Sequence, residues 1–415
     1  MSHLMSHRRI LFASLVGTAV EFYDFYIFAT AAALVFGPAF FPGPYAQLAA
    51  YASFSVAFFA RPLGGLVFGH FGDRLGRKST LVVSLLMMGL STLLIAFLPT
   101  YAMIGVAAPL LLCVMRFGQG FGLGGEWGGA SLLAVEYAPK GWAYRYGSFP
   151  PMGAPVGFLF ANGFFLILGM FLTDAQFRDW GWRLPFLASG LLVSLGLWVR
   201  LKIAETPDFV AATEKEAPPK VPIGELLRDH LVPTIAGTIG TVACFALFYI
   251  STVFVIGYGT KALHYDREVF LGVELLGILF MAAGIIVAGY YADRRSGTGV
   301  LMLGAVVTIP VGLTMASLLV PGSLVTVFAW LAFALFVMGF VYGPLGGWLP
   351  SLFPARVRYT GVSVTFNLGG IIGGGLTPLI AETLNARGGL TLVGLYLAGA
   401  GLLSLVGIAA VRRRA

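Results

Sequence analysis

Residues 69–78 read GHFGDRLGRK and join two long apolar runs of the chain. A second stretch, GYYADRRSGT at residues 289–298, follows another apolar run and repeats part of the first. The residues that recur, each displaced by 220 positions, are Gly69, Asp73 and Arg74 in the first copy and Gly289, Asp293 and Arg294 in the second. GEWGG at 125–129 and GPLGG at 343–347 are displaced by 218 positions. These matches predict a duplicated unit.

The composition of the chain excludes a water-soluble protein. Of its 415 residues 58% are hydrophobic and 11% are charged, whereas a soluble domain carries roughly 25% charged residues. The 56 glycines and 35 phenylalanines suit transmembrane helices, in which glycine lets backbones approach closely and phenylalanine faces lipid. We therefore expect a membrane protein.

The net charge of +8 does not indicate a nucleic-acid binder, because the basic residues form short clusters between apolar runs rather than one solvated face. Cys113 and Cys244 both lie inside apolar segments, so we expect neither a disulfide framework nor a metal site. The polar, basic N-terminus has no cleavage site after it and is interpreted as a retained tail. No cofactor is expected.

The apolar runs are long enough to be membrane-spanning helices and lack the period-2 alternation of a membrane β-barrel. The Pro321-Gly322-Ser323 turn signal divides an uncharged region into two spans. An all-α membrane protein with twelve spans is predicted, at residues 12–36, 50–71, 79–98, 104–136, 148–171, 184–201, 233–257, 270–292, 299–319, 323–350, 361–384 and 390–411.

One long polar connection divides six predicted helices from the other six. The expected division is an N-terminal six-helix bundle at 1–202, a linker at 203–232 and a C-terminal six-helix bundle at 233–415. With both termini on one side, 19 of the 26 basic residues lie on that side, which the positive-inside rule identifies as the cytoplasm. Two related halves around a midplane site are typical of alternating-access transporters.

Five charged residues lie inside predicted helices of the N-terminal half: Glu21, Asp24, Arg61, Arg116 and Glu126. Each would cost several kcal/mol in lipid unless it is paired or faces a polar cavity. Heights estimated from the helical rise predict two ion pairs, Arg61 with Glu126 and Asp24 with Arg116. A carboxylate that faces an arginine can titrate when a substrate competes for the guanidinium, so these residues are candidates for proton coupling.

Residues 116–124 read RFGQGFGLG. The stretch is not a phosphate-binding loop, because no short strand precedes it and no Gly-Lys-Ser/Thr ending follows. Its glycines are expected to let two helices approach closely.

These motifs resemble the major facilitator superfamily, through the G-x-x-x-D-R-x-G-R-[RK] loop at 69–78 and the R-x-x-Q-G-x-G-x-[AG] motif at 116–124. The strings AVEFYDFY at 19–26, FARPLG at 59–64 and GGEWGG at 124–129 are similar to its metabolite:proton symporter family, in the shikimate-transporter-like branch. The likeness covers nearly the whole chain. Ser351 and Ala143 depart from it, since relatives usually have Glu and Arg there.

The resemblance implies a cytoplasmic gate and a central substrate site. Gate candidates are Gly69, Asp73, Arg74, Gly76, Arg77, Asp293 and Arg294. Substrate-binding candidates are Arg116, Gln119, Asn162, Tyr249, Tyr342 and Asn367.

The sequence thus favours a proton-coupled symporter of the bacterial-type inner membrane, monomeric, that imports a small organic metabolite. A carboxylate is the preferred substrate, because an arginine can bind it bidentately. The alternatives are a symporter of zwitterionic osmolytes, whose relatives with a long C-terminal tail differ from this chain, and a proton-independent sugar facilitator or drug antiporter. An enzyme or receptor is not expected, because the chain carries no nucleophile, metal or phosphate motif.

Overall fold

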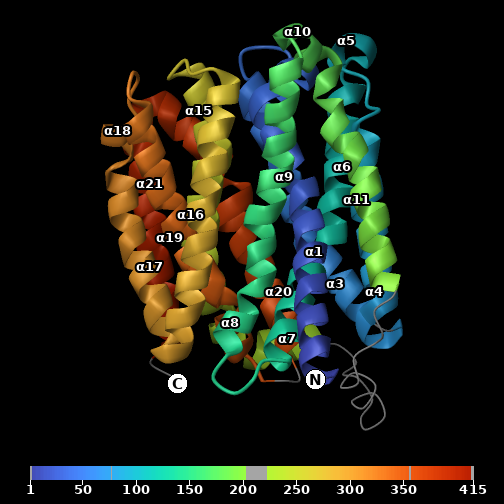
Figure 1. Ribbon diagram of the computed structural model, residues 1–415, viewed down its shortest axis with the longest axis vertical. Helices are drawn as coiled ribbons and strands as arrows, with labels where there is room; N and C mark the ends of the chain where they lie inside the picture. Colours follow the sequence, from blue (N-terminus) through green and yellow to red (C-terminus); the bar gives the residue numbers. More distant parts are fainter. Residues whose placement is uncertain (1, 76, 202–221, 355–356, 413–415) are drawn as a thin grey trace.

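A computed structural model of the chain describes residues 2–75, 77–201, 222–354 and 357–412. Within these residues every regular element is a helix. Two sets of helices stand side by side and roughly parallel to the long axis, with the helices of the first half on the right of Figure 1 and those of the second half on the left.

The first six spans consist of α-helices and short π-helical turns (η). In chain order these are α1 (Ser2–Ala31), η1 (Ala32–Phe36), α2 (Gly37–Phe40), α3 (Ala46–Leu75), α4 (Arg77–Ile95), α5 (Tyr101–Ile104), α6 (Ala107–Leu123), α7 (Glu126–Glu136), α8 (Ala143–Gly147), α9 (Phe149–Phe171), α10 (Asp174–Gln176), η2 (Phe177–Gly181) and α11 (Arg183–Leu201).

The last six spans follow α13, which lies after the connection between the halves. In chain order the elements of this half are α13 (Pro222–Asp229), α14 (Leu231–Tyr249), η3 (Ile250–Phe254), α15 (Val255–Lys261), α16 (Arg267–Arg294), α17 (Gly297–Leu313), α18 (Met315–Leu318), α19 (Leu324–Ser351), α20 (Arg358–Gly370), η4 (Ile371–Gly375) and α21 (Thr377–Arg412).

These elements confirm the prediction of twelve spans. Eight helical stretches of the described residues are long and apolar enough to cross a membrane, and three shorter apolar helices accompany them. The last long stretch, Arg358–Val411, is two spans, because Gly388 and Gly389 depart from helical geometry in the middle of α21. Gly322, at φ +82°, makes the predicted turn between α18 and α19.

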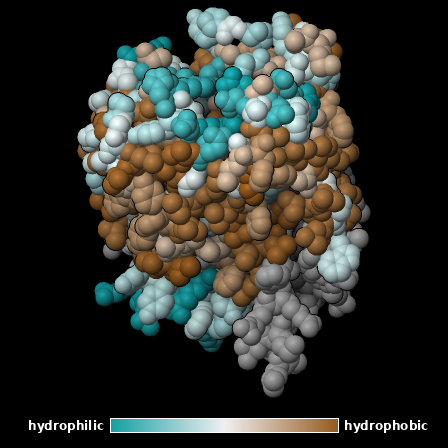
Figure 2. All heavy atoms as spheres, turned by 45° about the horizontal axis from the view of Figure 1, so that its top comes forward, coloured by the Kyte–Doolittle hydropathy of each residue, from teal (hydrophilic) through white to brown (hydrophobic). Residues whose placement is uncertain are grey.

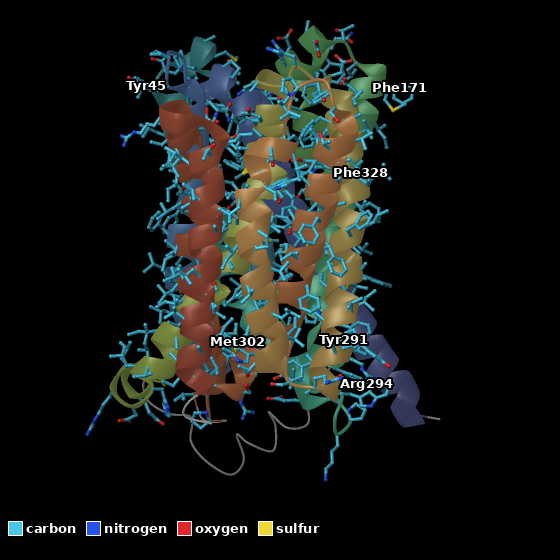
Figure 3. The ribbon with its side chains drawn as sticks, turned by 90° about the vertical axis from the view of Figure 1, so that its left-hand side faces the viewer. Tyr45, Phe171, Tyr291, Arg294, Met302 and Phe328 are labelled. Carbon is cyan, nitrogen blue, oxygen red and sulfur yellow. The ribbon has the colours of Figure 1, made fainter. Side chains whose placement is uncertain are left out.

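Both termini lie at one end of the bundle, called here the termini end, together with α7 and α8 (Figure 1). The opposite end, called the far end, carries α5, α10 and the end of α15. Between the polar ends a hydrophobic belt covers the surface (Figure 2). Exposed aromatic side chains mark its two rims, with Tyr45 and Phe171 at the far end and Tyr291 at the termini end (Figure 3). Such aromatic belts are typical of membrane–water interfaces.

The duplication predicted from the sequence extends to an irregularity of the backbone. The π-helical turn η3 begins 218 positions after η1, the same displacement that separates the two GxxGG strings. Each turn interrupts the first span of its half. Because π-helical turns are rare and frequent at functional sites, their matched positions indicate that the same part of each half is functionally important.

Candidate functional site

Arg116, on α6, is fully buried near the middle of the bundle. Its guanidinium carbon lies 4.2 Å from the ring centre of Phe25, 4.1 Å from that of Phe28 and 4.8 Å from that of Phe54. Its Nη1 donates to Gln119 Oε1 at 2.9 Å, and its Nη2 has no hydrogen-bond partner. The charge is thus held mainly by aromatic faces.

Arg61, on α3, occupies the same layer and is 5% exposed. Its guanidinium carbon lies 5.8 Å from the ring centre of Phe25 and 5.5 Å from that of Phe58, and its Nε has no hydrogen-bond partner. Phe25 therefore lies near both guanidinium groups, which are close enough to repel each other.

Glycines of the motif at 116–124 allow α6 to approach α3, the helix that carries Arg61. A Cβ on Gly120 would lie 2.1 Å from the carbonyl oxygen of Ala57, and a Cβ on Gly124 would lie 2.0 Å from that of Arg61. No side chain fits at such distances, so α6 packs with its backbone directly against α3. The prediction of close helix contact is confirmed.

The buried acids of the N-terminal half are Glu21, Asp24 and Glu126, each at most 4% exposed. Neither oxygen of Asp24 makes a hydrogen bond, and the hydroxyls of Thr92 and Ser189 lie beside it. Glu21 is close enough to Arg61 to attract its charge.

The predicted ion pair of Asp24 with Arg116 is wrong for this conformation, because neither Asp24 oxygen has a hydrogen-bond partner and no ion pair joins the two within the described part of the chain. The pairing of Arg61 with Glu126 stays a prediction. Glu126 opens α7, where the positive end of the helix dipole favours an acid.

A chain of polar side chains separates Asp24 from Arg116. Arg116 donates to Gln119, and Gln119 Nε2 donates to Thr92 Oγ1 at 2.7 Å. Thr92 in turn lies beside Asp24. Two neutral polar groups, Thr92 and Gln119, thus couple the charge of Asp24 electrostatically to that of Arg116.

Two predicted substrate residues of the C-terminal half meet this layer. Tyr249, at the end of α14, packs its ring 5.4 Å from the ring centres of both Phe54 and Phe58. Tyr342, on α19, accepts a hydrogen bond from Trp127 Nε1 at 3.1 Å. Both phenol groups act electrostatically on Arg61. The arginines of one half thus face the tyrosines of the other.

The other two predicted substrate residues already have partners in the protein. Asn367 Nδ2 donates to the carbonyl oxygen of Gly124 at 2.8 Å, which ties the two halves together. Asn162 Oδ1 accepts from Thr30 between α9 and α1. Nothing in the sequence distinguished these two asparagines from the residues of the arginine layer, the name used here for the two buried arginines and the rings around them: Arg61, Arg116, Phe25, Phe28, Phe54 and Phe58.

An aromatic stack that sequence reasoning missed lies between the halves. Trp127 of α7 and Phe366 of α20 are parallel within 1°, with ring centres 3.6 Å apart. Trp127 stands in the GGEWGG string, but nothing in the string indicates a partner. The stack joins the two halves, because α7 belongs to the first and α20 to the second.

The halves are tied at the termini end through Asp293, at the end of α16. Its carboxylate accepts from the backbone N–H groups of Tyr144 at 2.8 Å and Arg145 at 3.1 Å, and it pairs with Arg145 Nε at 3.2 Å. Arg294 instead lies over the ring of Tyr290 on its own helix, 4.2 Å from its centre. In the first copy of the motif, Gly76 and the side chains at Gly69, Asp73, Arg74 and Arg77 lie outside the described residues.

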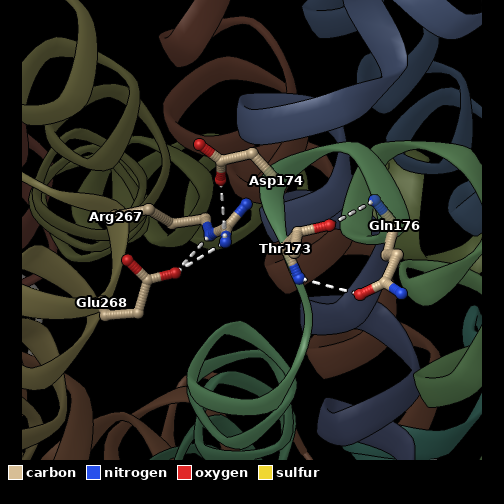
Figure 4. A network of polar contacts seen from close by, with 5 residues as sticks. All are labelled: Thr173, Asp174, Gln176, Arg267 and Glu268. Atoms are coloured by element: carbon tan, nitrogen blue, oxygen red, sulfur yellow. Dashed lines mark hydrogen bonds and ion pairs between the residues drawn. The ribbon is translucent and has the colours of Figure 1, made fainter.

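The halves are also tied at the far end. Arg267, at the start of α16, pairs with Asp174 at 3.2 Å and with its neighbour Glu268 at 2.6 Å, next to the Thr173–Gln176 capping box (Figure 4). Its guanidinium carbon lies 3.8 Å from the ring centre of Phe177.

A second far-end contact joins Tyr51 of α3, whose hydroxyl donates to the carbonyl oxygen of Val253 at 3.3 Å. Because contacts cross between the halves at both ends, the arginine layer is enclosed. No sequence motif marked Arg267 or Tyr51.

Comparison with known proteins finds relatives that are named as transport proteins. A family model described as "Sugar (and other) transporter" matches residues 10–221. The "Inner membrane metabolite transport protein YhjE" of Escherichia coli K12 is 47% identical, over 97% of this chain and 93% of the relative. The "Shikimate transporter" of the same organism is 38% identical over 91% and 87%. Its "Proline/betaine transporter" is 31% identical over 91% and 77%.

Among solved structures, a D-xylose–proton symporter matches with a TM-score of 0.74 at 15% identity, over 95% of this chain and 96% of that one. At this identity the match supports the fold alone.

Proposed function

Because this chain belongs to the sugar (and other) transporter family of the major facilitator superfamily, a family of multi-pass membrane transporters and not of enzymes, we propose that it imports a small organic carboxylate together with protons. In this proposal the bundles 1–202 and 233–415 move against each other, the termini end faces the cytoplasm and the protein acts as a monomer in the inner membrane.

The observation that carries the proposal is the pair of buried guanidinium groups. No ion pair joins Arg116 to a carboxylate among the described residues, and Arg61 and Arg116 each retain a nitrogen without a hydrogen-bond partner. A buried charge without a counter-charge is costly. A substrate carboxylate would supply that counter-charge and could bind a guanidinium through two parallel hydrogen bonds.

Proton coupling is supported by the buried acids around the arginine layer. Asp24 connects to Arg116 through Thr92 and Gln119, and Glu21 lies near Arg61. The arrival of a substrate anion adds negative charge beside these acids, which disfavours their ionised forms. A proton therefore binds with the substrate, and the coupling ion needs no metal or cofactor.

The test is uptake into proteoliposomes with an acid-outside pH gradient switched on and off, using shikimate, 2-oxoglutarate, citrate, an aromatic acid, betaine and proline. Gradient-dependent accumulation of an acid is expected. Arg116→Gln should weaken its binding by about 2–5 kcal/mol, as for one partner of a buried charge pair. Arg228→Gln, at a side chain that is 87% exposed, is the matched control. Accumulation that ignores the gradient, or survives Arg116→Gln unchanged, would refute the proposal.

A zwitterionic osmolyte is the second candidate, because aromatic rings crowd the site. Phe54, Phe58 and Tyr249 lie within 5.4 Å of one another, centre to centre, and such faces attract a quaternary ammonium group. Competition separates the two candidates. Inhibition of uptake by tetramethylammonium favours the osmolyte. Inhibition only by an organic acid that has no ammonium group favours the carboxylate.

A further inference from the structure

Glu274 is a buried acid outside the arginine layer, in the half that otherwise has few charges within its helices. It is fully buried on α16, and neither of its carboxyl oxygens has a hydrogen-bond partner. It lies seven residues after Arg267, or about 10 Å along the helix from the far end. The next turn of the same face carries Gly277, which packs against Leu331 and Leu335 of α19.

The groups around Glu274 leave its carboxyl without a counter-charge. The helices packed against α16 are α19, α9, α8, α17 and α15. Their titratable or charged side chains are Tyr342 on α19, Tyr258 and Lys261 on α15, and Tyr144, Arg145 and Tyr146 on α8 at the other end of the helix. On α16 itself, Arg267 and Glu268 belong to the far-end ion pairs. Within the described residues no ion pair reaches Glu274.

Packing alone does not account for an acid at this position. A leucine or glutamine would fill similar space without the cost of burying a carboxylate, which is several kcal/mol for the charged form in an apolar surrounding. A group whose charged form is this unfavourable is accommodated as the neutral acid. What glutamate adds at this position is therefore the ability to exchange a proton.

Glu274 also borders the far-end contact between the halves. Tyr51, whose hydroxyl donates to Val253 across that contact, is close enough to Glu274 to be affected by its charge. Toward the termini end, in contrast, the buried residues of α16 are apolar as far as Ala292: Gly277, Ile278, Met281, Gly284, Ile285, Ala288, Gly289 and Ala292. A proton can thus reach Glu274 from the far end when that end opens, and it has no polar route along α16 to the other side.

We propose that Glu274 is a proton-binding site that controls closure of the far end. When the far end is open, a proton from that side binds the Glu274 carboxylate and forms the neutral acid, which allows the end to close around it. When the end reopens, the same proton returns to the same side. The inference deepens the proposed function and rests on it for the transport cycle, but Glu274 adds no proton to those carried with the substrate.

The experiment compares wild-type protein, Glu274→Gln and the control Glu136→Gln, an exposed acid on α7, in proteoliposomes. Substrate exchange is measured with the same substrate concentration on both sides of the membrane while the pH on the far side is raised. Once Glu274 loses its proton, exchange by wild type and control should fall about tenfold per pH unit, as for one required proton. Exchange by Glu274→Gln, which mimics the neutral acid, should lack this tenfold fall and keep only the pH dependence of the protons that move with the substrate. The ratio of protons to substrate should be the same in all three.

Infrared difference spectra provide a readout that does not depend on transport. Wild-type protein should show the carbonyl stretch of a buried protonated carboxylic acid that is absent from Glu274→Gln and shifted in Glu274→Asp. Identical spectra, or an unchanged pH dependence of exchange in Glu274→Gln, would overturn the inference. Failure of the wild type to accumulate substrate in a pH gradient would instead overturn the proposed function, so the two failures are distinguishable.

Discussion

Replacement of Asp293 by asparagine tests whether the contact at the termini end holds the two halves together. The Asp293 side chain is 2% exposed, accepts two backbone N–H groups of α8 at 2.8 and 3.1 Å, and pairs with Arg145 Nε at 3.2 Å. The two N–H groups bind different oxygens of the carboxylate. The amide has nearly the same shape, but it loses the negative charge and keeps one acceptor oxygen, and its NH2 group faces a donor. The substitution therefore weakens the contact without changing its size.

The size of the effect follows from these contacts. A hydrogen bond to a charged group contributes about 1.5–3 kcal/mol, and charge-assisted bonds are roughly twice as strong as neutral ones. Weakening two such bonds and removing one ion pair should destabilise the closed termini end by about 2–4 kcal/mol. At about 1.4 kcal/mol per factor of ten, the open fraction at that end should rise about 30- to 700-fold.

The assay is alkylation of a cysteine placed at Ser363, which is buried and packs against Gly128 of the other half. Cys113 and Cys244 are first replaced by alanine. The labelling rate from the termini side should rise with the open fraction in Asp293→Asn and stay constant in Asp229→Asn, an exposed acid on α13. A labelling rate within twofold of wild type, in a variant that melts at the wild-type temperature, would refute the reasoning.

The remaining predictions concern the far end, the helix contacts and the arginine layer. Arg267→Gln should shift the same labelling assay in the opposite direction by about fivefold, because exposed ion pairs contribute only about 1 kcal/mol; increased labelling would contradict a far-end tie. Gly346→Ala would place a Cβ 2.0 Å from the carbonyl oxygen of Gly147 and should destabilise the protein by about 1–3 kcal/mol in thermal unfolding, whereas Gly399→Ala, with no neighbour within 4 Å, should not. Tyr249→Phe should keep the ring packing and the melting temperature but weaken acid binding by about 1 kcal/mol in calorimetry; unchanged affinity would remove the phenol from the site.

The helical framework was predictable because lipid leaves the backbone few choices. Every peptide group in the hydrocarbon must be paired within its own span, so the length of an apolar run is enough to identify a helix. Proline and glycine then locate the turns, as at Pro321 and Gly322, where α18 and α19 separate. Repeated residues such as Asp73 and Asp293 revealed the duplication without any three-dimensional information.

The pairing of charges was not predictable in the same way. The rise per residue estimates how deep Asp24 and Arg116 lie, but it does not say which neighbour each side chain faces around its helix. In the structure Arg116 turns toward Phe25, Phe28 and Phe54, so depth alone led to the wrong partner.

The sequence by itself determined that this chain is a duplicated bundle of twelve membrane helices. It also identified the charged residues within those helices, whose burial in lipid is costly unless they are paired or face a polar cavity. These are properties of composition, run length and motif, which each segment carries alone. Only the tertiary structure decided that two arginines share one aromatic layer and that Arg267 and Asp293 tie the halves at opposite ends of α16. The physical reason is that such contacts depend on the rotation and packing of helices distant in the chain, which no local pattern encodes.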